Sequence, residues 1–187
     1  MAELTEKERL IGQLSFTWDY MFWNYMQDLS DEEYFWEPVK NNWSIREAED
    51  GTVTIDWNHE QLKNDPVTTI AWLINHMAYF FTDRYFKHFE NKPVHPSDLS
   101  LPMTAVGALA NLEKAYQRWL GALQSVDDER YLQPCGEAEA YYPEEPFATL
   151  VLHINREFIY HAAECNLLRD LYSNSLCDGF QPPPARI

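Results

Sequence analysis

Four long segments of this chain carry apolar residues at helical spacing, and this pattern limits the folds available to it. The segments are 5–29, 67–90, 104–123 and 146–172. In each, apolar side chains recur at steps of three and four residues, which puts them on one helical face that needs a partner to cover it. There is no strand–helix alternation and no repeat of about 20 to 50 residues, which argues against a parallel sheet and a solenoid. We therefore predict an all-α fold, a four-helix bundle.

Start and stop signals place an insertion between the first two long helices. Ser30 is followed by three acidic residues, which is typical of the N-cap of a short helix, and Pro38 must end that helix. Residues 44–56 alternate in polarity around Asp50-Gly51, a common hairpin turn. We expect a small helical and ribbon insertion here. Pro66 suits the first turn of the second long helix, and Thr104 suits the cap of the third.

Length and composition favour one folded domain. The chain has 187 residues, of which 45% are hydrophobic and 15% aromatic, enough to close a single core. We predict one domain over 1–187, with a frayed tail at 175–187, where Gly179 and three consecutive prolines follow the last helix.

The charge balance argues against two classes of partner. Thirty acidic residues against 14 Lys and Arg give a net charge of −16, which opposes binding to phosphate backbones and to anionic membranes. The first residues lack the basic and apolar regions of a secretory signal, and no apolar run has membrane-spanning length. We expect a cytoplasmic protein that binds neither nucleic acid nor membrane.

The cysteines predict neither a disulfide framework nor a cysteine-rich zinc site. Cys135, Cys165 and Cys177 are odd in number, far apart and outside any C-x-x-C pattern. A metal would therefore need other ligands. Cys165, four residues after His161, could serve as a thiol ligand, but we interpret it as a small buried hydrophobic residue.

The last long segment carries three polar residues at steps of four: His153, Glu157 and His161. At about 100° per residue, Glu157 and His161 lie within roughly 20° of the apolar direction, whereas His153 lies about 60° to one side. A carboxylate and an imidazole that face the core need a compensating charge or hydrogen bonds. A divalent cation could provide that compensation.

His76, at the edge of the apolar stripe of the second long segment, can face this pair. One histidine together with Glu-x3-His supplies three ligands and leaves a coordination position open, as in catalytic zinc sites. Spacing alone favours hydrogen-bonded core histidines over a metal site, because such histidines are more common. We expect His59, His88 and His95 to be solvated surface residues without a role.

Three stretches resemble a known family. Residues 66–76 (PVTTIAWLINH) and 153–172 (HINREFIYHAAECNLLRDLY) are similar to the second- and fourth-helix motifs of the DinB-like metal-binding superfamily. Residues 29–38 and 42–44 resemble the stretch after its first helix. The similarity is closest to actinobacterial-type members. In its ligand set the chain resembles mycothiol-dependent maleylpyruvate isomerases, in which a histidine of helix two and a Glu-x3-His of helix four hold zinc.

This resemblance implies a site, a chemistry and an assembly. The metal ligands would be His76, Glu157 and His161, with zinc as the first choice and Ni²⁺, Fe²⁺ or Mn²⁺ also suited to a carboxylate ligand. The activity would be that of a metal-dependent thiol S-transferase or isomerase, acting on a low-molecular-weight thiol and an electrophilic substrate, in a homodimer. We expect His153 to hydrogen-bond Glu157 or a pocket water and so orient the carboxylate. The alternative function is a non-catalytic helical module that binds a small molecule or a partner, and no catalytic residue is assigned.

Overall fold

The computed structural model describes residues 3–57, 67–95, 98–140 and 142–175.

The first long helical segment begins with a complete capping box. Thr5 caps the backbone of Glu8, and the Glu8 carboxylate accepts a hydrogen bond from the Thr5 amide at 2.8 Å. The segment runs as α1 (Glu6–Phe16), a π-helical segment η1 (Thr17–Trp23) and α2 (Asn24–Met26). It ends three residues before the predicted Leu29, which is nevertheless buried and so satisfies the apolar pattern.

The predicted insertion is present after α2. Ser30 caps the short helix α3 (Asp31–Tyr34). The strands β1 (Ile45–Glu47) and β2 (Val53–Ile55) form an antiparallel hairpin in which Ile45 is paired with Ile55. Its turn contains Gly51 at φ +81°, a conformation that favours glycine. This part of the sequence prediction is confirmed.

The second and third long helices follow the hairpin in the order that the sequence predicts. The second long helix, α4 (Ile70–Phe89), begins three residues after the predicted Val67. Residues 67–69 are extended because Val67 and Thr69 form backbone hydrogen bonds with Trp43. Pro66 lies outside the described residues. The third long helix, α5 (Ala105–Ser125), has Thr104 as its N-cap, as predicted.

The segment between α5 and the last helix is not all loop. It contains the short helix α6 (Asp128–Leu132), which Asp127 caps through the amide of Arg130. The fourth long helix, α7, spans Phe147–Ser175. Ser175, the first residue of the predicted tail, still belongs to α7, and residues 176–187 lie outside the described residues.

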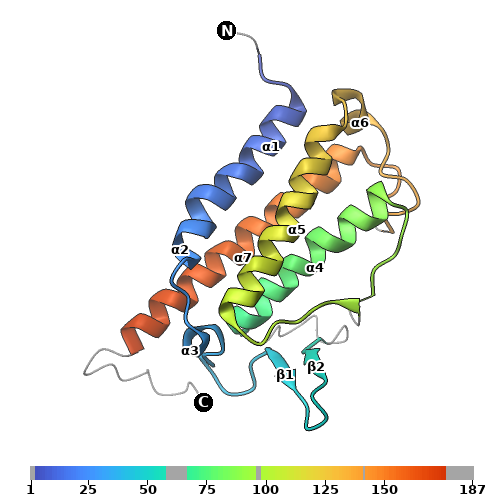
Figure 1. The fold of residues 1–187 in the computed structure, drawn as a ribbon. Helices are drawn as coiled ribbons and strands as arrows, with labels where there is room; N and C mark the ends of the chain where they lie inside the picture. Colours follow the sequence, from blue (N-terminus) through green and yellow to red (C-terminus); the bar gives the residue numbers. More distant parts are fainter. Residues whose placement is uncertain (1–2, 58–66, 96–97, 141, 176–187) are drawn as a thin grey trace, which may run out of the picture.

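Figure 1 shows how the long helices assemble. In the described residues, α4 packs most extensively on α5, and α7 lies against α1, η1 and α4. The hairpin lies beside the N-terminal end of α4. The long helices and the single two-stranded sheet of the described residues confirm the all-α, DinB-like architecture.

One aromatic cluster joins all four long helical segments at the centre of the bundle. Trp18 of η1 stacks on Tyr116 of α5, with ring centroids 3.9 Å apart. Phe158 of α7 lies 5.9 Å from Trp18 and 5.4 Å from Phe81 of α4. These side chains are buried, and each large ring removes much apolar surface from water. The burial of aromatic faces therefore sets the positions of α4 and α7.

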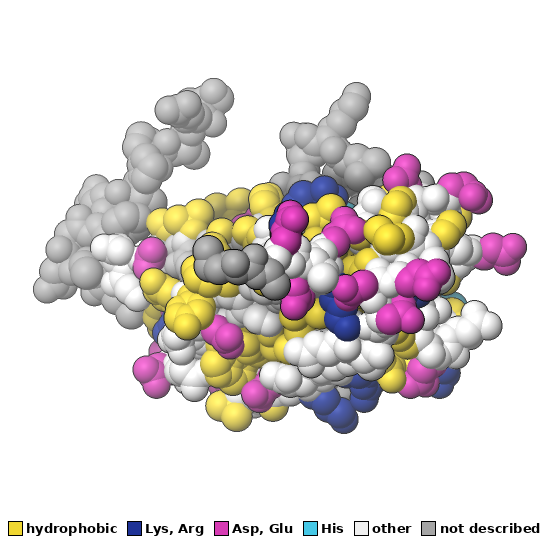
Figure 2. Space-filling model, turned by 90° about the horizontal axis from the view of Figure 1, so that it is seen from above, with side chains coloured by type: hydrophobic (Ala, Val, Ile, Leu, Met, Phe, Trp, Pro, Cys, Tyr) yellow, Lys and Arg dark blue, Asp and Glu magenta, His cyan; other side chains and the backbone are white. Residues whose placement is uncertain are grey.

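The surface reflects the acidic composition. Figure 2 shows acidic side chains spread over much of the visible face, with the basic ones gathered in fewer places. No helix of the described chain has both the length and the apolar content to cross a membrane.

Candidate metal centre

His76 is placed by the first two turns of α4. Thr69 caps this helix by accepting the Trp72 amide, and its hydroxyl lies 2.9 Å from that of Ser44. The Trp72 ring stacks on the His76 imidazole at 4.6 Å and donates its indole N–H to the Asp56 carbonyl at 2.7 Å. The hairpin segment thus fixes Trp72, and Trp72 supports one face of the imidazole.

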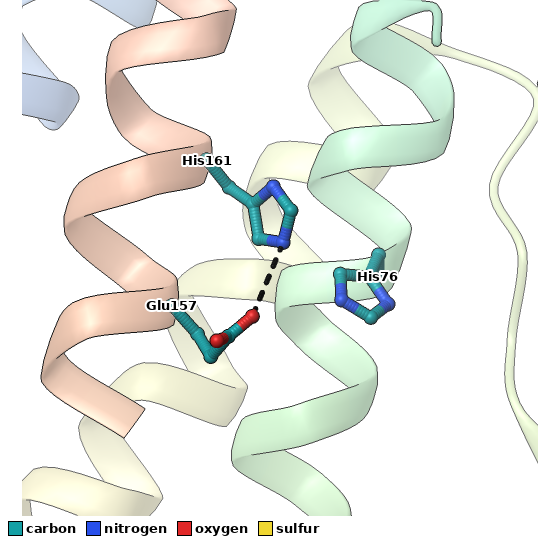
Figure 3. Close-up of side chains that lie close together, drawn as sticks. All are labelled: His76, Glu157 and His161. Carbon is teal, nitrogen blue, oxygen red and sulfur yellow. Dashed lines mark ion pairs between the residues drawn. The ribbon is translucent and has the colours of Figure 1, made fainter. Parts of the chain in front are cut away.

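Glu157 and His161 come from the facing helix α7, one turn apart. His161 is buried and Glu157 is partly exposed. His161 Nε2 lies 3.7 Å from Glu157 Oε2. Figure 3 shows the two side chains reaching from α7 towards His76 on α4. The imidazole centroids of His76 and His161 are 4.8 Å apart and nearly perpendicular, at 88°. The predicted inward direction of Glu157 and His161 agrees with this placement.

The three side chains fit a metal ion. One donor atom from each of His76, Glu157 and His161 lies within 4.8 Å of the other two. Two donors that bind one ion at 2.0–2.2 Å can be at most about 4.4 Å apart, so small side-chain adjustments close the set. His76 Nδ1 is buried and has no hydrogen-bond partner in the described chain, and such an atom needs a compensating group. Nitrogen and carboxylate ligands suit zinc and other first-row divalent metals.

Burial keeps the His76 imidazole neutral. Desolvation is the main cause, and the neighbouring His161 is the second, and together they lower the pKa of His76 to about 3. A neutral imidazole retains the lone pair that binds a metal. His76 is therefore in its ligand form at neutral pH.

Glu164 orients His161 from the far side of the ring. Its Oε2 lies 2.8 Å from His161 Nδ1, which leaves Nε2 facing Glu157 and the candidate site. A carboxylate on the outer nitrogen of a metal-binding histidine fixes the tautomer and the ring direction. Glu164 was not predicted as a site residue, although its position three residues after His161 on the same helix is a usable signal.

His153 lies at the edge of the same group. Its Nδ1 is 3.9 Å from Glu157 Oε1, too far for a hydrogen bond, and 2.7 Å from a guanidinium nitrogen of Arg156. Of the two partners predicted for His153, Glu157 or a pocket water, the structure does not form the direct hydrogen bond to Glu157. Burial lowers the pKa of His153, and the charge of Glu157 partly opposes this shift.

The structure corrects one of the surface assignments. The His88 side chain is only 1% exposed and lies 3.8 Å from Glu139, because α4 turns it towards the segment after α6. His95 is exposed as expected, and His59 lies outside the described residues. Cys165 is fully buried, as predicted, and burial raises the pKa of its thiol.

A cavity of about 280 Å³ opens beside two of the three candidate ligands. Its lining includes His76 and Glu157 at one end and the charged side chains of Asp83, Arg84 and Lys87 on α4. A separate cavity of about 350 Å³ lies between α4 and α5 and contains none of the three candidate ligands. Of these two cavities, the smaller one lies beside candidate ligands and could bring a substrate to the site.

Fold and site together define a helical-bundle protein with a candidate metal centre between two of its long helices. Over residues 13–165, most of its length, the chain matches the DinB superfamily. It belongs to this superfamily, whose members are generally metal-binding. No curated protein and no solved structure is significantly similar to the chain.

Proposed function

We propose that this protein binds a divalent cation through His76, Glu157 and His161. With this cation it would act as a thiol S-transferase or isomerase. The observation that supports the proposal best is the convergence of three donors from α4 and α7 beside a cavity. Three protein ligands leave a position open for another molecule, as catalytic sites require and closed structural sites do not.

Zinc is the proposed metal. Two imidazoles and one carboxylate form a ligand set used by catalytic zinc sites. The carboxylate also suits Ni²⁺, Fe²⁺ and Mn²⁺, so these are the alternatives. Glu164 supports metal binding in this proposal by keeping His161 Nε2 directed at the site.

A bound divalent cation supplies Lewis acidity, which lowers the pKa of a coordinating thiol and favours its nucleophilic thiolate form. The residues around it perform the remaining tasks. Trp72 and Trp57 cover the His76 ring at centroid distances of 4.6 and 5.4 Å and so limit the access of water. The cavity beside Glu157 would hold the thiol and the electrophile together.

The proposed setting is the cytoplasm, where low-molecular-weight thiols remain reduced. The proposed partners are such a thiol and an electrophilic small molecule. Nucleic acid and membrane surfaces are not proposed partners, because the net charge of −16 opposes both.

Conjugation of glutathione to 1-chloro-2,4-dinitrobenzene by the zinc-loaded protein tests the activity. We expect a rate above that of zinc and buffer alone, lost in His76→Ala and His161→Ala. Glu113→Gln, on the exposed face of α5, serves as the matched control and should retain the rate. Zinc-loaded protein that accelerates neither this reaction nor the additions of other small thiols would instead be a non-catalytic binding module.

A further inference from the structure

One face of α4 connects the candidate metal centre to a charged cluster. Each lining residue from this helix has another one three or four positions away, so together they form a single stripe: His76, Tyr79, Phe80, Asp83, Arg84 and Lys87. At 1.5 Å per residue, Asp83 lies about 10 Å along the helix from His76, and Arg84 about 12 Å. The cavity therefore has a metal-binding end and a charged end.

The charged end is an ordered network. Asp83 Oδ2 lies 2.7 Å from a terminal nitrogen of Arg84 and 3.0 Å from Lys87 Nζ. Arg84 Nε lies 3.5 Å from Glu139 Oε2. Two carboxylates and two cations give this group no net charge. We call Asp83, Arg84, Lys87 and Glu139 the polar cluster.

The network leaves hydrogen-bonding capacity unused. The Asp83 side chain is 4% exposed, yet its Oδ1 has no hydrogen-bond partner in the described residues. Arg84 Nε is also buried without a hydrogen bond there. A buried carboxylate oxygen or guanidinium N–H without a partner is costly. A ligand that offers both a donor and an acceptor would satisfy these atoms.

We propose that the polar cluster binds the far end of the substrate, and that this end is a zwitterionic amino-acid head group. Its ammonium group would donate to Asp83 Oδ1, and its carboxylate would accept from Lys87 and Arg84. The neutral charge sum of the cluster favours such a head group over a purely anionic or cationic one. The proposal rests on the proposed function, since it assigns the substrate of that site as an elongated thiol with a head group about 10 Å from its sulfur.

Two thiols that differ only at this head group test the proposal on the cobalt-loaded full chain. Glutathione carries a γ-glutamyl group with an ammonium and a carboxylate, and N-acetyl-cysteinylglycine has an uncharged acetyl group in place of that whole γ-glutamyl group. The readout is the sulfur-to-cobalt charge-transfer absorption during titration. We expect glutathione to half-saturate this band at a concentration about tenfold lower, as expected for charged hydrogen bonds. Equal half-saturation concentrations would overturn the proposal.

Variants of the polar cluster should remove this preference without removing the metal. Asp83→Asn and Lys87→Met are expected to bring the two half-saturation concentrations within about threefold of each other, while the cobalt visible spectrum without thiol stays unchanged. Lys87 is 31% exposed, so its variant should fold even where Asp83→Asn does not. Lys114→Met, at an exposed site on α5, is the matched control. Variants that keep the wild-type preference would contradict the assignment.

The proposed function and the head-group site fail in different ways. A protein that binds cobalt but shows no charge-transfer band with any thiol would contradict the thiol chemistry alone. Calorimetric binding of S-methylglutathione, which lacks a free thiol, then tests the polar cluster. Binding that weakens about tenfold or more in Lys87→Met would support the head-group site, and no binding to the wild type would overturn it.

Discussion

The two ring nitrogens of His161 have different partners, and this difference gives the imidazole its direction. Nδ1 contacts Glu164 at 2.8 Å, whereas Nε2 faces Glu157 at 3.7 Å. We predict that Glu164→Gln weakens metal affinity by about 10- to 100-fold, because loss of an orienting carboxylate has this effect at other metal sites. Competition with a chromogenic chelator measures the change. Unchanged affinity in Glu164→Gln would show that the contact does not support the site.

His153 gives a second test of the groups around the ligands. It contacts Arg156 directly and Glu157 only at 3.9 Å. We expect His153→Ala to purify with metal that a chelator removes more easily than from the wild type. His161→Ala should lose stoichiometric metal. Equal loss in both variants, measured by elemental analysis, would make His153 a ligand.

The described cysteines should be unreactive in the folded protein. Burial raises the pKa values of both the Cys135 and the Cys165 thiols, which suppresses the nucleophilic thiolate. We predict that neither is alkylated by iodoacetamide at pH 8 until urea unfolds the chain, as peptide mass spectrometry would report. Rapid labelling of Cys165 in the native protein would contradict its place in the core.

The sequence could predict the candidate ligands but not all of their surroundings. His76, Glu157 and His161 were predicted because a family motif and helical spacing coincide on them. In a single sequence, charged residues are expected at the surface, and this expectation covers Asp83, Glu139 and Glu164. Only the packing of α4 against α7 and the segment after α6 shows which of these charges are buried.

At the scale of elements, the cap of α4 ties the hairpin segment to the helix that bears His76. The Thr69 hydroxyl accepts a hydrogen bond from the Trp72 amide and contacts the Ser44 hydroxyl, and both contacts are buried. We predict that Thr69→Ala lowers the free energy of unfolding by about 1 to 2 kcal/mol, as loss of a cap and a buried hydrogen bond would. Urea denaturation gives the value.

Thr104 provides the comparison for this prediction. It caps α5 through the Gly107 amide at an exposed position. Thr104→Ala should cost less than Thr69→Ala, and Thr69→Ser should retain most of the stability. An equal loss for the two alanine variants would show that the contact with Ser44 adds nothing.

The type of an element could be predicted where its apolar pattern extends over many residues. The residues at which the element begins and ends could not be predicted as well. The apolar stripes of α4, α5 and α7 identify these helices without tertiary information. Helix α4 begins three residues later than predicted because Val67 and Thr69 form backbone hydrogen bonds with Trp43, a contact between distant parts of the chain. Helix α6 could not be predicted from periodicity because its five residues are too few to show a period, although Asp127 is a capping signal.

At the scale of the molecule, α7 and the first helical segment pack on each other, and each presents an apolar side chain to solvent. Tyr20 is 65% exposed and Leu167 58% exposed, and the adjacent Asn166 donates to the Met21 carbonyl at 2.7 Å. Exposed apolar groups on adjacent helices favour burial in an interface. We predict a homodimer through this face, with a mass of about twice 22.1 kDa by light scattering at micromolar concentration. Tyr20→Glu with Leu167→Glu should give the monomer, whereas a monomeric wild type would contradict the prediction.

The central claim is that His76, Glu157 and His161 hold a divalent metal. Elemental analysis of protein purified without added metal tests it most directly. We predict a stoichiometric divalent metal in the wild type, zinc first, that is absent from His76→Ala and His161→Ala. A metal-free wild type whose melting temperature does not rise with added Zn²⁺ or Ni²⁺ would contradict the claim, because a ligand that binds the native state must stabilise it.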